Sequence, residues 1–216
     1  MIGASGGVGS ALVAGLAAQG YAVTALSRST DWLDITDEAS IAQSLERFDG
    51  PFQRVIVATG QLHGAGTPPE KALSHLTPEA MQAQFAVNAM GPMLVLKHAR
   101  RLLPRREPAV FAALSARVGS IGDNQLGGWY SYRAAKAALN QFLHSAAIEL
   151  ARTHPRLTCV ALHPGTVATS FTAAYRDRHT VVAPDVAAGN LLSVMDGLTP
   201  EDSGGFYDWA GKRIPW

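Results

Sequence analysis

Short apolar segments alternate along the chain with longer segments in which apolar residues recur at helical spacing. The apolar segments, rich in Val, Ile, Leu and Ala, cover residues 21–27, 54–58, 109–114 and 157–162. The helical patterns cover residues 11–18, 79–103, 130–152 and 184–198. Near-continuous apolar strands separated by helices are typical of a parallel sheet buried on both faces. We therefore predict an α/β protein with a Rossmann fold, a doubly wound parallel sheet with helices on both faces.

Two places depart from a regular alternation. The connection between residues 27 and 34 is too short for a crossover helix, so we expect Trp32-Leu33-Asp34 to be a short strand reached by a loop. Only Met1 and Ile2 precede the first helix-forming segment and its glycine-rich turn. Either the chain begins with a stub of the first strand, or upstream residues are absent. There are no repeats or linkers, and we expect one domain over residues 1–216.

Length, composition and charge indicate one globular domain and give no sign of a nucleic-acid or membrane partner. A chain of 216 residues with 47% hydrophobic residues suits one α/β domain. A net charge of +1 gives no reason to expect a nucleic-acid partner. The single cysteine, Cys159, excludes an internal disulfide and fits a reducing cytosol. No apolar run has the length of a membrane span and no signal pattern opens the chain, so we expect a cytoplasmic protein without membrane contact.

A glycine-rich turn opens the chain, with Gly3, Gly7 and Gly9 in a G-x-x-x-G-x-G spacing. Glycines permit a tight strand-to-helix turn and let the backbone approach a pyrophosphate closely. The N–H groups and the positive end of the following helix then face the phosphates, and Ser5 adds a hydroxyl donor. The alternative is a flexible glycine-rich terminus without a ligand. The helix and the apolar segment that follow favour a dinucleotide site.

Tyr132 and Lys136 are four residues apart, which places them on one face of a helix. A tyrosine has a pKa near 10, and a nearby cation is expected to lower it toward the range useful for proton transfer. The ammonium can also reach ribose hydroxyls. The alternative is an ordinary exposed pair that adds a little helix stability.

Polar residues follow the predicted strands at the edge where ligands bind in such sheets. Asp34, Thr59-Gly60, Ser115 and the segment 163–169 all occupy such positions. Ser115 could hydrogen-bond a substrate carbonyl or hydroxyl. His63 and His163 lack a carboxylate or second histidine at metal-ligand spacing, so we expect no metal site. Cys159 lies in the middle of a predicted strand, so we expect it to be a buried core thiol and not a nucleophile.

These motifs as a set resemble the short-chain dehydrogenase/reductase family. The set comprises Gly3, Gly7-Val8-Gly9, Asn88-Ala-Met-Gly91, Ser115, Tyr132, Lys136 and Pro164-Gly165-Thr166-Val167-x-Thr169. Residues 114–121 and 127–133 resemble the branch that contains C-factor-like and sniffer-type carbonyl reductases.

The resemblance implies a nicotinamide cofactor and a role for each matching residue. Tyr132 would be the general acid/base, Lys136 would bind ribose and tune Tyr132, and Ser115 would polarise the substrate. Asn88 would belong to a proton-relay water site. Asp34 would lie near the adenine. The remaining cofactor contacts would come from the glycine turn, from the ends of two strands and near the nicotinamide: Gly3, Ser5, Gly7, Val8, Gly9, Thr59, Gly60, Pro164, Gly165, Val167 and Thr169.

The chain also departs from the family pattern. Ala58-Thr59-Gly60-Gln61 stands where the family often has Asn-Asn-Ala-Gly. Close relatives carry two serines where this chain has Ser115-Ala116, and the family's active serine aligns nearer Ala116. Ser120 is therefore a second candidate for the active serine.

Arg28 indicates which cofactor the site prefers. It follows the predicted second strand, where an acidic residue favours NAD(H) and an arginine accommodates the 2′-phosphate of NADP(H). We expect NADP(H), with NAD(H) possible through Asp31. The predicted function is carbonyl–alcohol interconversion on a small, apolar molecule by a homodimer or homotetramer. The alternative is a dinucleotide-binding signalling or sensor protein with little turnover.

Overall fold

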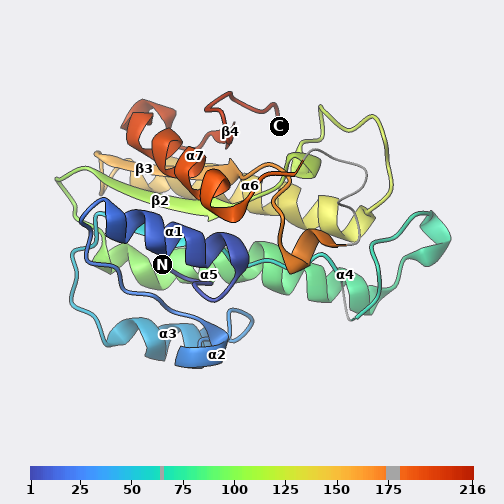
Figure 1. Cartoon of the computed structure of the whole chain (residues 1–216), viewed down its shortest axis with the longest axis horizontal. Coiled ribbons are helices and arrows are strands. Elements are labelled where there is room, and N and C mark those ends of the chain that lie inside the picture. Colours follow the sequence, from blue (N-terminus) through green and yellow to red (C-terminus); the bar gives the residue numbers. More distant parts are fainter. Residues whose placement is uncertain (64–65, 174–180) are drawn as a thin grey trace.

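The computed structural model describes residues 1–63, 66–173 and 181–216, and strands of this part form one parallel sheet (Figure 1). The strands are β1 (Arg54–Val57), β2 (Ala109–Leu114), β3 (Leu157–His163) and β4 (Phe206–Asp208), in the order β1-β2-β3-β4. All three pairings are parallel. Ile2 lies beyond β1 and forms isolated parallel bridges to Val57 and to Leu26. The predicted α/β fold with a parallel sheet is confirmed.

Helices cover both faces of this sheet. They are α1 (Gly7–Ala18), α2 (Arg28–Asp31), α3 (Glu38–Glu46), α4 (Pro78–Phe85), α5 (Gly91–Ala99), α6 (Tyr130–Leu150) and α7 (Pro184–Gly197). Short 3₁₀ turns occur at Leu73–His75, Arg100–Leu102, Arg117–Gly119 and Pro200–Asp202. Figure 1 shows α1 and α7 side by side on one face of the sheet, with α5 and α6 on the other.

Alternate strand residues pack into two separate cores. Phe111 and Cys159 belong to the core that includes residues of α5 and α6. Ala112 and Val160 belong to the core that includes residues of α1 and α7. Both sets are fully buried, which explains why the strand sequences are apolar at nearly every position.

The predicted helix over 79–103 is helical throughout but not uniform. A π-helical segment, Ala86–Met90, joins α4 to α5. Such segments contain an additional residue per turn and occur mostly as single turns inside α-helices, often at functional sites. Asn88 lies within this segment and is fully buried.

Two predictions for the first forty residues are wrong. Residues 21–27 are not a strand, because only Leu26 pairs, through its bridge to Ile2. A strand needs a neighbour along its whole length, whereas the backbone of residues 1–4 forms hydrogen bonds with this segment only at Thr24 and Leu26. Residues 32–34 are not a strand either. The helix α2 occupies the loop, and Trp32 ends it in the left-handed conformation at a φ of 58°.

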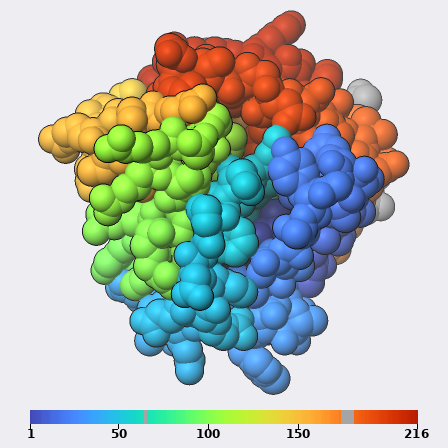
Figure 2. Space-filling model, turned by 90° about the vertical axis from the view of Figure 1, so that its left-hand side faces the viewer, coloured from blue at the N-terminus to red at the C-terminus, as the bar shows by residue number. Residues whose placement is uncertain are grey.

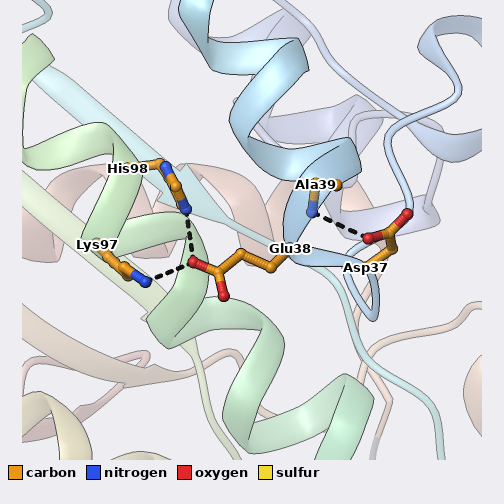
Figure 3. Close-up of polar contacts among 5 residues, drawn as sticks. All are labelled: Asp37, Glu38, Ala39, Lys97 and His98. Carbon is orange, nitrogen blue, oxygen red and sulfur yellow. Dashed lines mark hydrogen bonds and ion pairs between the residues drawn. The ribbon is translucent and has the colours of Figure 1, made fainter.

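The sequence analysis did not predict α3, whose Ile41 and Leu45 are buried in the core shared with α5 and α6 and whose first residues also make polar contacts. Asp37 accepts a hydrogen bond from the Ala39 amide at 2.9 Å and so caps the helix. Glu38 contacts Lys97 at 2.5 Å and His98 at 2.9 Å, both on α5 (Figure 3). These exposed pairs contribute little free energy, but they join α3 to α5 at one edge.

The edge at which the strands begin is hollowed. Figure 2 shows a cleft between the segment after α1 and the residues before β1, with the N-terminus at its bottom. Met1, Val23 and Phe52 line it with other, mostly apolar residues. The Met1 amine donates to the Thr24 carbonyl at 2.8 Å, and burial lowers the pKa of this amine from 8.0 to about 6. This cleft lies away from the polar residues singled out above.

No helix in the described ranges is both long and apolar enough to cross a bilayer.

Candidate active site

The glycine-rich turn is built as its spacing predicts. Gly3 has a φ of 82°, and a Cβ added there would lie 2.9 Å from the Ala58 carbonyl carbon and the Thr59 nitrogen. A Cβ on Gly9 would lie 2.1 Å from the Gly3 carbonyl oxygen. Neither position can carry a side chain without moving the backbone. The turn therefore packs directly against the end of β1.

The N-terminus of α1 is suited to an anion. Its N-cap, Gly6, has no side chain, and no acidic residue lies in the first turn. The first N–H groups of a helix have no intrahelical acceptor, and the helix dipole makes this end positive. Gly6 lines two neighbouring cavities, so this end of α1 faces open space.

The two cavities extend across the carboxyl ends of the strands and share wall residues. The smaller has a volume of about 270 Å³ and the larger about 770 Å³. Both are lined by Gly6, Ala58, Thr59 and Gly60. Eleven predicted site residues line the smaller cavity: Gly7, Val8, Thr59, Gly60, Ser115, Tyr132, Lys136, Pro164, Gly165, Val167 and Thr169. Predicted residues in the larger cavity are Gly3, Ser5, Arg28, Asp34, Thr59 and Gly60.

Tyr132 and Lys136 lie on one face of α6, as predicted, and both are buried. Lys136 Nζ donates to the Leu114 carbonyl at 2.8 Å and lies 6.0 Å from the centroid of the Tyr132 ring. The rings of Trp129 and Phe171 flank the Tyr132 ring, each with a centroid distance of 6.2 Å. The phenol and the ammonium therefore occupy fixed positions in one cavity.

Burial dominates the acid–base properties of this pair. It raises the pKa of Tyr132 above its usual 10 and lowers the pKa of Lys136 from 10.5 to about 7. The expected lowering of the tyrosine pKa by Lys136 is not found, because desolvation of the phenolate by burial determines the shift. Tyr132 therefore holds its proton at neutral pH.

Asn88 does not line either cavity but lies directly behind their shared wall. Its Oδ1 accepts from the Gln61 amide at 3.1 Å, and its Nδ2 donates to the Gln61 carbonyl at 2.8 Å. A Cβ on Gly60 would lie 3.3 Å from Asn88 Oδ1 and 3.9 Å from Lys136 Nζ. The π-helical segment thus holds the loop after β1 beside Lys136.

The structure brings one of the two candidate serines to Tyr132. Ser115 lines the smaller cavity, next to Ala116, and its Oγ donates to Asn140 Oδ1 at 2.7 Å. Ser120 is buried, accepts a hydrogen bond from the Asp123 amide at 3.1 Å, and is not among the residues lining that cavity. The Ser115 hydroxyl retains acceptor capacity while its proton points at Asn140.

The segment after β3 forms another wall of the smaller cavity. Gly165 has a φ of 79°, which allows the chain to turn there. His163 precedes this turn, and burial, with a smaller contribution from Arg117, lowers the pKa of its imidazole to about 4. His163 is therefore neutral at physiological pH. In the described part of the chain, no group of His, Cys, Asp and Glu side chains could hold a metal ion.

Arg28 and Asp34 line the larger cavity, whereas Asp31 does not. Asp31 Oδ2 accepts from the Ser27 amide at 2.8 Å and from the Thr30 hydroxyl at 2.6 Å. These two hydrogen bonds hold the Asp31 carboxylate within the turn of α2. Asp34 Oδ1 is bound by the amide and hydroxyl of Thr36, which lowers its pKa.

The two cavities together fit a dinucleotide. The uncapped end of α1 lies between them, where a pyrophosphate would bind. The buried Thr59 Oγ1, on the shared wall, has no hydrogen-bond partner in the described structure and is available to a ligand. Arg28 supplies a cation to the larger cavity, and Lys136 supplies an amine to the smaller one.

Asn140 was missed in the sequence analysis, although a signal was present. Tyr132, Lys136 and Asn140 are spaced by four residues, so they follow one face of α6. Asn140 is buried and holds Ser115. The spacing identifies this face of α6 as the wall of the site.

Comparison with known proteins gives matches over nearly the whole chain. The profile of a family described as enoyl-(acyl carrier protein) reductase matches residues 3–204. A 1-hydroxy-2-glutathionyl-2-methyl-3-butene dehydrogenase of Rhodococcus sp. (strain AD45) is 32% identical over 184 residues, which are 85% of this chain and 78% of that protein. The C-signal of Myxococcus xanthus is 40% identical over 139 residues, covering 63% of this chain and 78% of that protein.

Solved structures agree with the sequence matches. An NADPH-bound carbonyl reductase from chicken fatty liver superposes with a TM-score of 0.82 at 25% identity, over 100% of this chain and 97% of that chain. The carbonyl reductase Sniffer of D. melanogaster gives a TM-score of 0.84 at 20% identity with the same coverage, a likeness of fold alone.

The lowered pKa of Lys136 predicts a pH-dependent stability. An unfolded lysine keeps its proton up to about 10.5, whereas folded Lys136 loses it above about 7. Between these values the unfolded state binds more protons, so stability rises with pH. We expect the unfolding free energy of wild type minus that of Lys136→Met to increase by about 2 kcal/mol from about pH 7 to about pH 9 in urea titrations. A Lys212→Met control, at an exposed lysine, is expected to show no such trend, and a flat difference for Lys136→Met would contradict the assignment.

Proposed function

This chain belongs to the short-chain dehydrogenase/reductase family and is an oxidoreductase of that family, and on this premise we propose its reaction. We propose that it interconverts a carbonyl and an alcohol by hydride transfer with NADP(H), and that Tyr132 is the general acid/base. The observation that carries the proposal is the buried Tyr132–Lys136 pair in a cavity that adjoins the anion-binding end of α1.

In the proposed mechanism the protein binds, orients and moves a proton. NADP(H), when bound, supplies the hydride. The first turn of α1 holds the pyrophosphate, and Thr59 Oγ1 donates or accepts a hydrogen bond at the shared wall. In the reductive direction Tyr132 donates its proton to the carbonyl oxygen, which its raised pKa permits because the phenol stays protonated at neutral pH. In the oxidative direction the phenolate accepts that proton.

Lys136 is proposed to act through its position and its charge. One N–H bond of its Nζ is directed at the Leu114 carbonyl, which leaves the remaining hydrogens for ribose hydroxyls. With a pKa near 7, the amine gains its full charge when anionic groups bind nearby. That charge then stabilises the phenolate that forms when Tyr132 gives up its proton.

We propose NADP(H) over NAD(H) on the contents of the larger cavity. Arg28, Ser27 and Ser29 line it, a guanidinium and hydroxyls that suit a 2′-phosphate. The Asp31 carboxylate, which would favour a free ribose 2′-hydroxyl, is bound to Ser27 and Thr30 instead. The carbonyl reductase from chicken fatty liver was solved with NADPH bound, which supports the same preference.

We propose a small, apolar carbonyl or alcohol as the substrate. The wall of the smaller cavity near Tyr132 consists largely of apolar groups, among them Leu114, Ala116 and Phe171. We also propose a homodimer or homotetramer. Its support is the exposed apolar surface of α6, where Phe142 and Ile148 are 43% and 62% exposed.

A dinucleotide-binding signalling or sensor protein is the second candidate. The match to the C-signal of Myxococcus xanthus favours it. So does the site itself, because Ala116 has no hydroxyl and the Ser115 proton points at Asn140. Measurement of NADPH-dependent carbonyl reduction distinguishes the two candidates, because only the enzyme is expected to turn over.

Tyr132→Phe tests the proposed reaction. It removes the proton donor but no cofactor contact, so we expect kcat for NADPH-dependent reduction of phenanthrenequinone to fall by about 10²- to 10⁴-fold. The Kd for NADPH, measured by fluorescence titration, should change by less than about twofold. Tyr130→Phe is the matched control, since its side chain has no lysine four residues on. A Tyr132→Phe enzyme with most of its activity would overturn the assignment.

Arg28→Ala tests the cofactor preference. A charge-assisted hydrogen bond contributes about 1.5–3 kcal/mol, so the Kd for NADPH should rise by about 10- to 100-fold while that for NADH stays unchanged. Arg47→Ala is a control on an arginine outside the larger cavity. Equal affinity of the wild type for NADH and NADPH in calorimetry would show that Arg28 does not recognise a phosphate.

Ser115→Ala and Ser120→Ala separate the two candidate serines. We expect the first to reduce kcat by about tenfold or more, because Ser115 lines the cavity of Tyr132, and the second to reduce it by less than about threefold. Both serines are buried, so melting temperatures must be compared alongside the rates. Equal or reversed losses in kcat would transfer the role to Ser120.

A further inference from the structure

The helix that carries Tyr132 and Lys136 begins at a residue that cannot cap it. Trp129 is the N-cap of α6 and has a φ of 51°, and the indole carries a hydrogen-bond donor but no acceptor. No acidic residue lies in the first turn of α6. The amides at the start of a helix need acceptors from elsewhere. Here the acceptors come from a loop sixty-one residues upstream of Ser131.

Glu70 supplies them. Its Oε2 accepts from the Ser131 amide at 3.2 Å, and its Oε1 accepts from the Ser131 hydroxyl. Its backbone carbonyl accepts from the Trp129 amide at 2.5 Å. Three hydrogen bonds from one residue thus hold the first turn of α6.

The hydrogen bonds between Glu70 and Ser131 are buried, and no ion pair with another described residue supplements them. Glu70 is 5% exposed and Ser131 is 2% exposed. Among the described residues no lysine, arginine or histidine forms an ion pair with Glu70. A buried polar side chain is costly unless it is hydrogen-bonded, and the Ser131 amide and hydroxyl donate to the two oxygens of the Glu70 side chain.

We propose that Glu70 is a positioning residue for the proposed reaction, acting through the first turn of α6. Ser131 precedes Tyr132 directly, and Trp129, bound by the Glu70 carbonyl, packs its ring against the Tyr132 ring. Glu70 therefore fixes the chain at two positions, Trp129 and Ser131, directly before the residue that bears the phenol. Lys136 lies one turn further along and is held independently by the Leu114 carbonyl. The inference rests on the proposed role of Tyr132.

Glu70→Ala and Glu70→Gln test this proposal. The alanine variant loses both side-chain acceptors, so the phenol is misplaced and kcat for phenanthrenequinone reduction should fall by about tenfold or more. The KM for NADPH should stay within about twofold of wild type, because the α1 site and Lys136 are untouched. In Glu70→Gln the amide oxygen accepts from the Ser131 amide and the amide nitrogen donates to its hydroxyl, so kcat should recover to within about threefold. Glu79→Ala, at an exposed glutamate in the first turn of α4, is the matched control.

Hydrogen exchange gives a readout that does not need turnover. Loss of a helix cap is expected to raise the exchange rate of amides in residues 130–134 by about fivefold in Glu70→Ala, with exchange in α1 and α7 unchanged. Ser131→Ala, a milder change, should give a smaller rise in these rates. Combined with Glu70→Ala, it should add little to the loss of kcat.

The outcomes separate the two proposals. If the wild type reduces no carbonyl probe, the proposed function fails, while the exchange rates still decide whether Glu70 orders the first turn of α6. Unchanged kcat and unchanged exchange in a folded Glu70→Ala protein would overturn the role of Glu70. So would a variant in which kcat, NADPH affinity and exchange throughout the sheet deteriorate together, because that pattern indicates general destabilisation. Failure of glutamine to restore kcat would also overturn it.

Discussion

The parallel register of β1, β2 and β3 is the constraint on which the site depends. Val57 pairs with Ala113, and Leu114 pairs with Leu162, so the three strands end nearly in step. Thr59, Ser115 and the turn after His163 therefore emerge at one edge, although more than a hundred residues separate the first from the last. Main-chain hydrogen bonds fix this edge, and both faces of the sheet are packed with apolar side chains. The alignment of the strands thus determines where the site residues lie.

The helix α6 completes the site by turning one polar face toward that edge. Lys136 and Asn140 each bind a group at the end of β2, the Leu114 carbonyl and the Ser115 hydroxyl. Both contacts are buried, so water does not compete for these hydrogen bonds. Burial also sets the chemistry, because the same exclusion of water keeps the phenol protonated and weakens the basicity of the amine. One packing arrangement thus determines both the position and the protonation of the pair.

The sequence predicts the features of this protein that arise from local pattern. Ala109–Leu114 is a run of consecutive apolar residues, and its bounds as a strand match the prediction. Tyr132 and Lys136 share a helix face because the spacing of four residues leaves no alternative within a helix. Within the first forty residues, the turn and α1 follow the local pattern, but residues 21–27 were wrongly predicted as a strand. They have the composition of a strand, yet the backbone of residues 1–4 forms hydrogen bonds with them only at Thr24 and Leu26. Strand pairing is a tertiary property that composition does not encode.

The side-chain environment was also beyond local pattern. The sequence predicted that Lys136 would lower the pKa of Tyr132. The burial of both side chains, which reverses that prediction, follows from the way Trp129, Phe171 and β2 surround them. Glu70 offered no signal at all, since the turn that it caps lies sixty-one residues away and depends on the path of the intervening loop. Asn140 could have been found from the four-residue spacing alone.

The π-helical segment has a consequence for how α4 and α5 relate to each other. One additional residue in a helical turn shifts the angular phase of everything that follows by about 100°, since a regular α-helix turns by that amount per residue. Asn88 lies inside this segment, where the additional residue sets the rotation of α4 relative to α5. Removal of one residue between 86 and 90 would restore the regular α-helical turn and rotate α4 relative to α5 by about that angle. Asn88 and α5 could then not both keep their present orientations, so the two hydrogen bonds that Asn88 makes with Gln61, beside Lys136, depend on the additional residue.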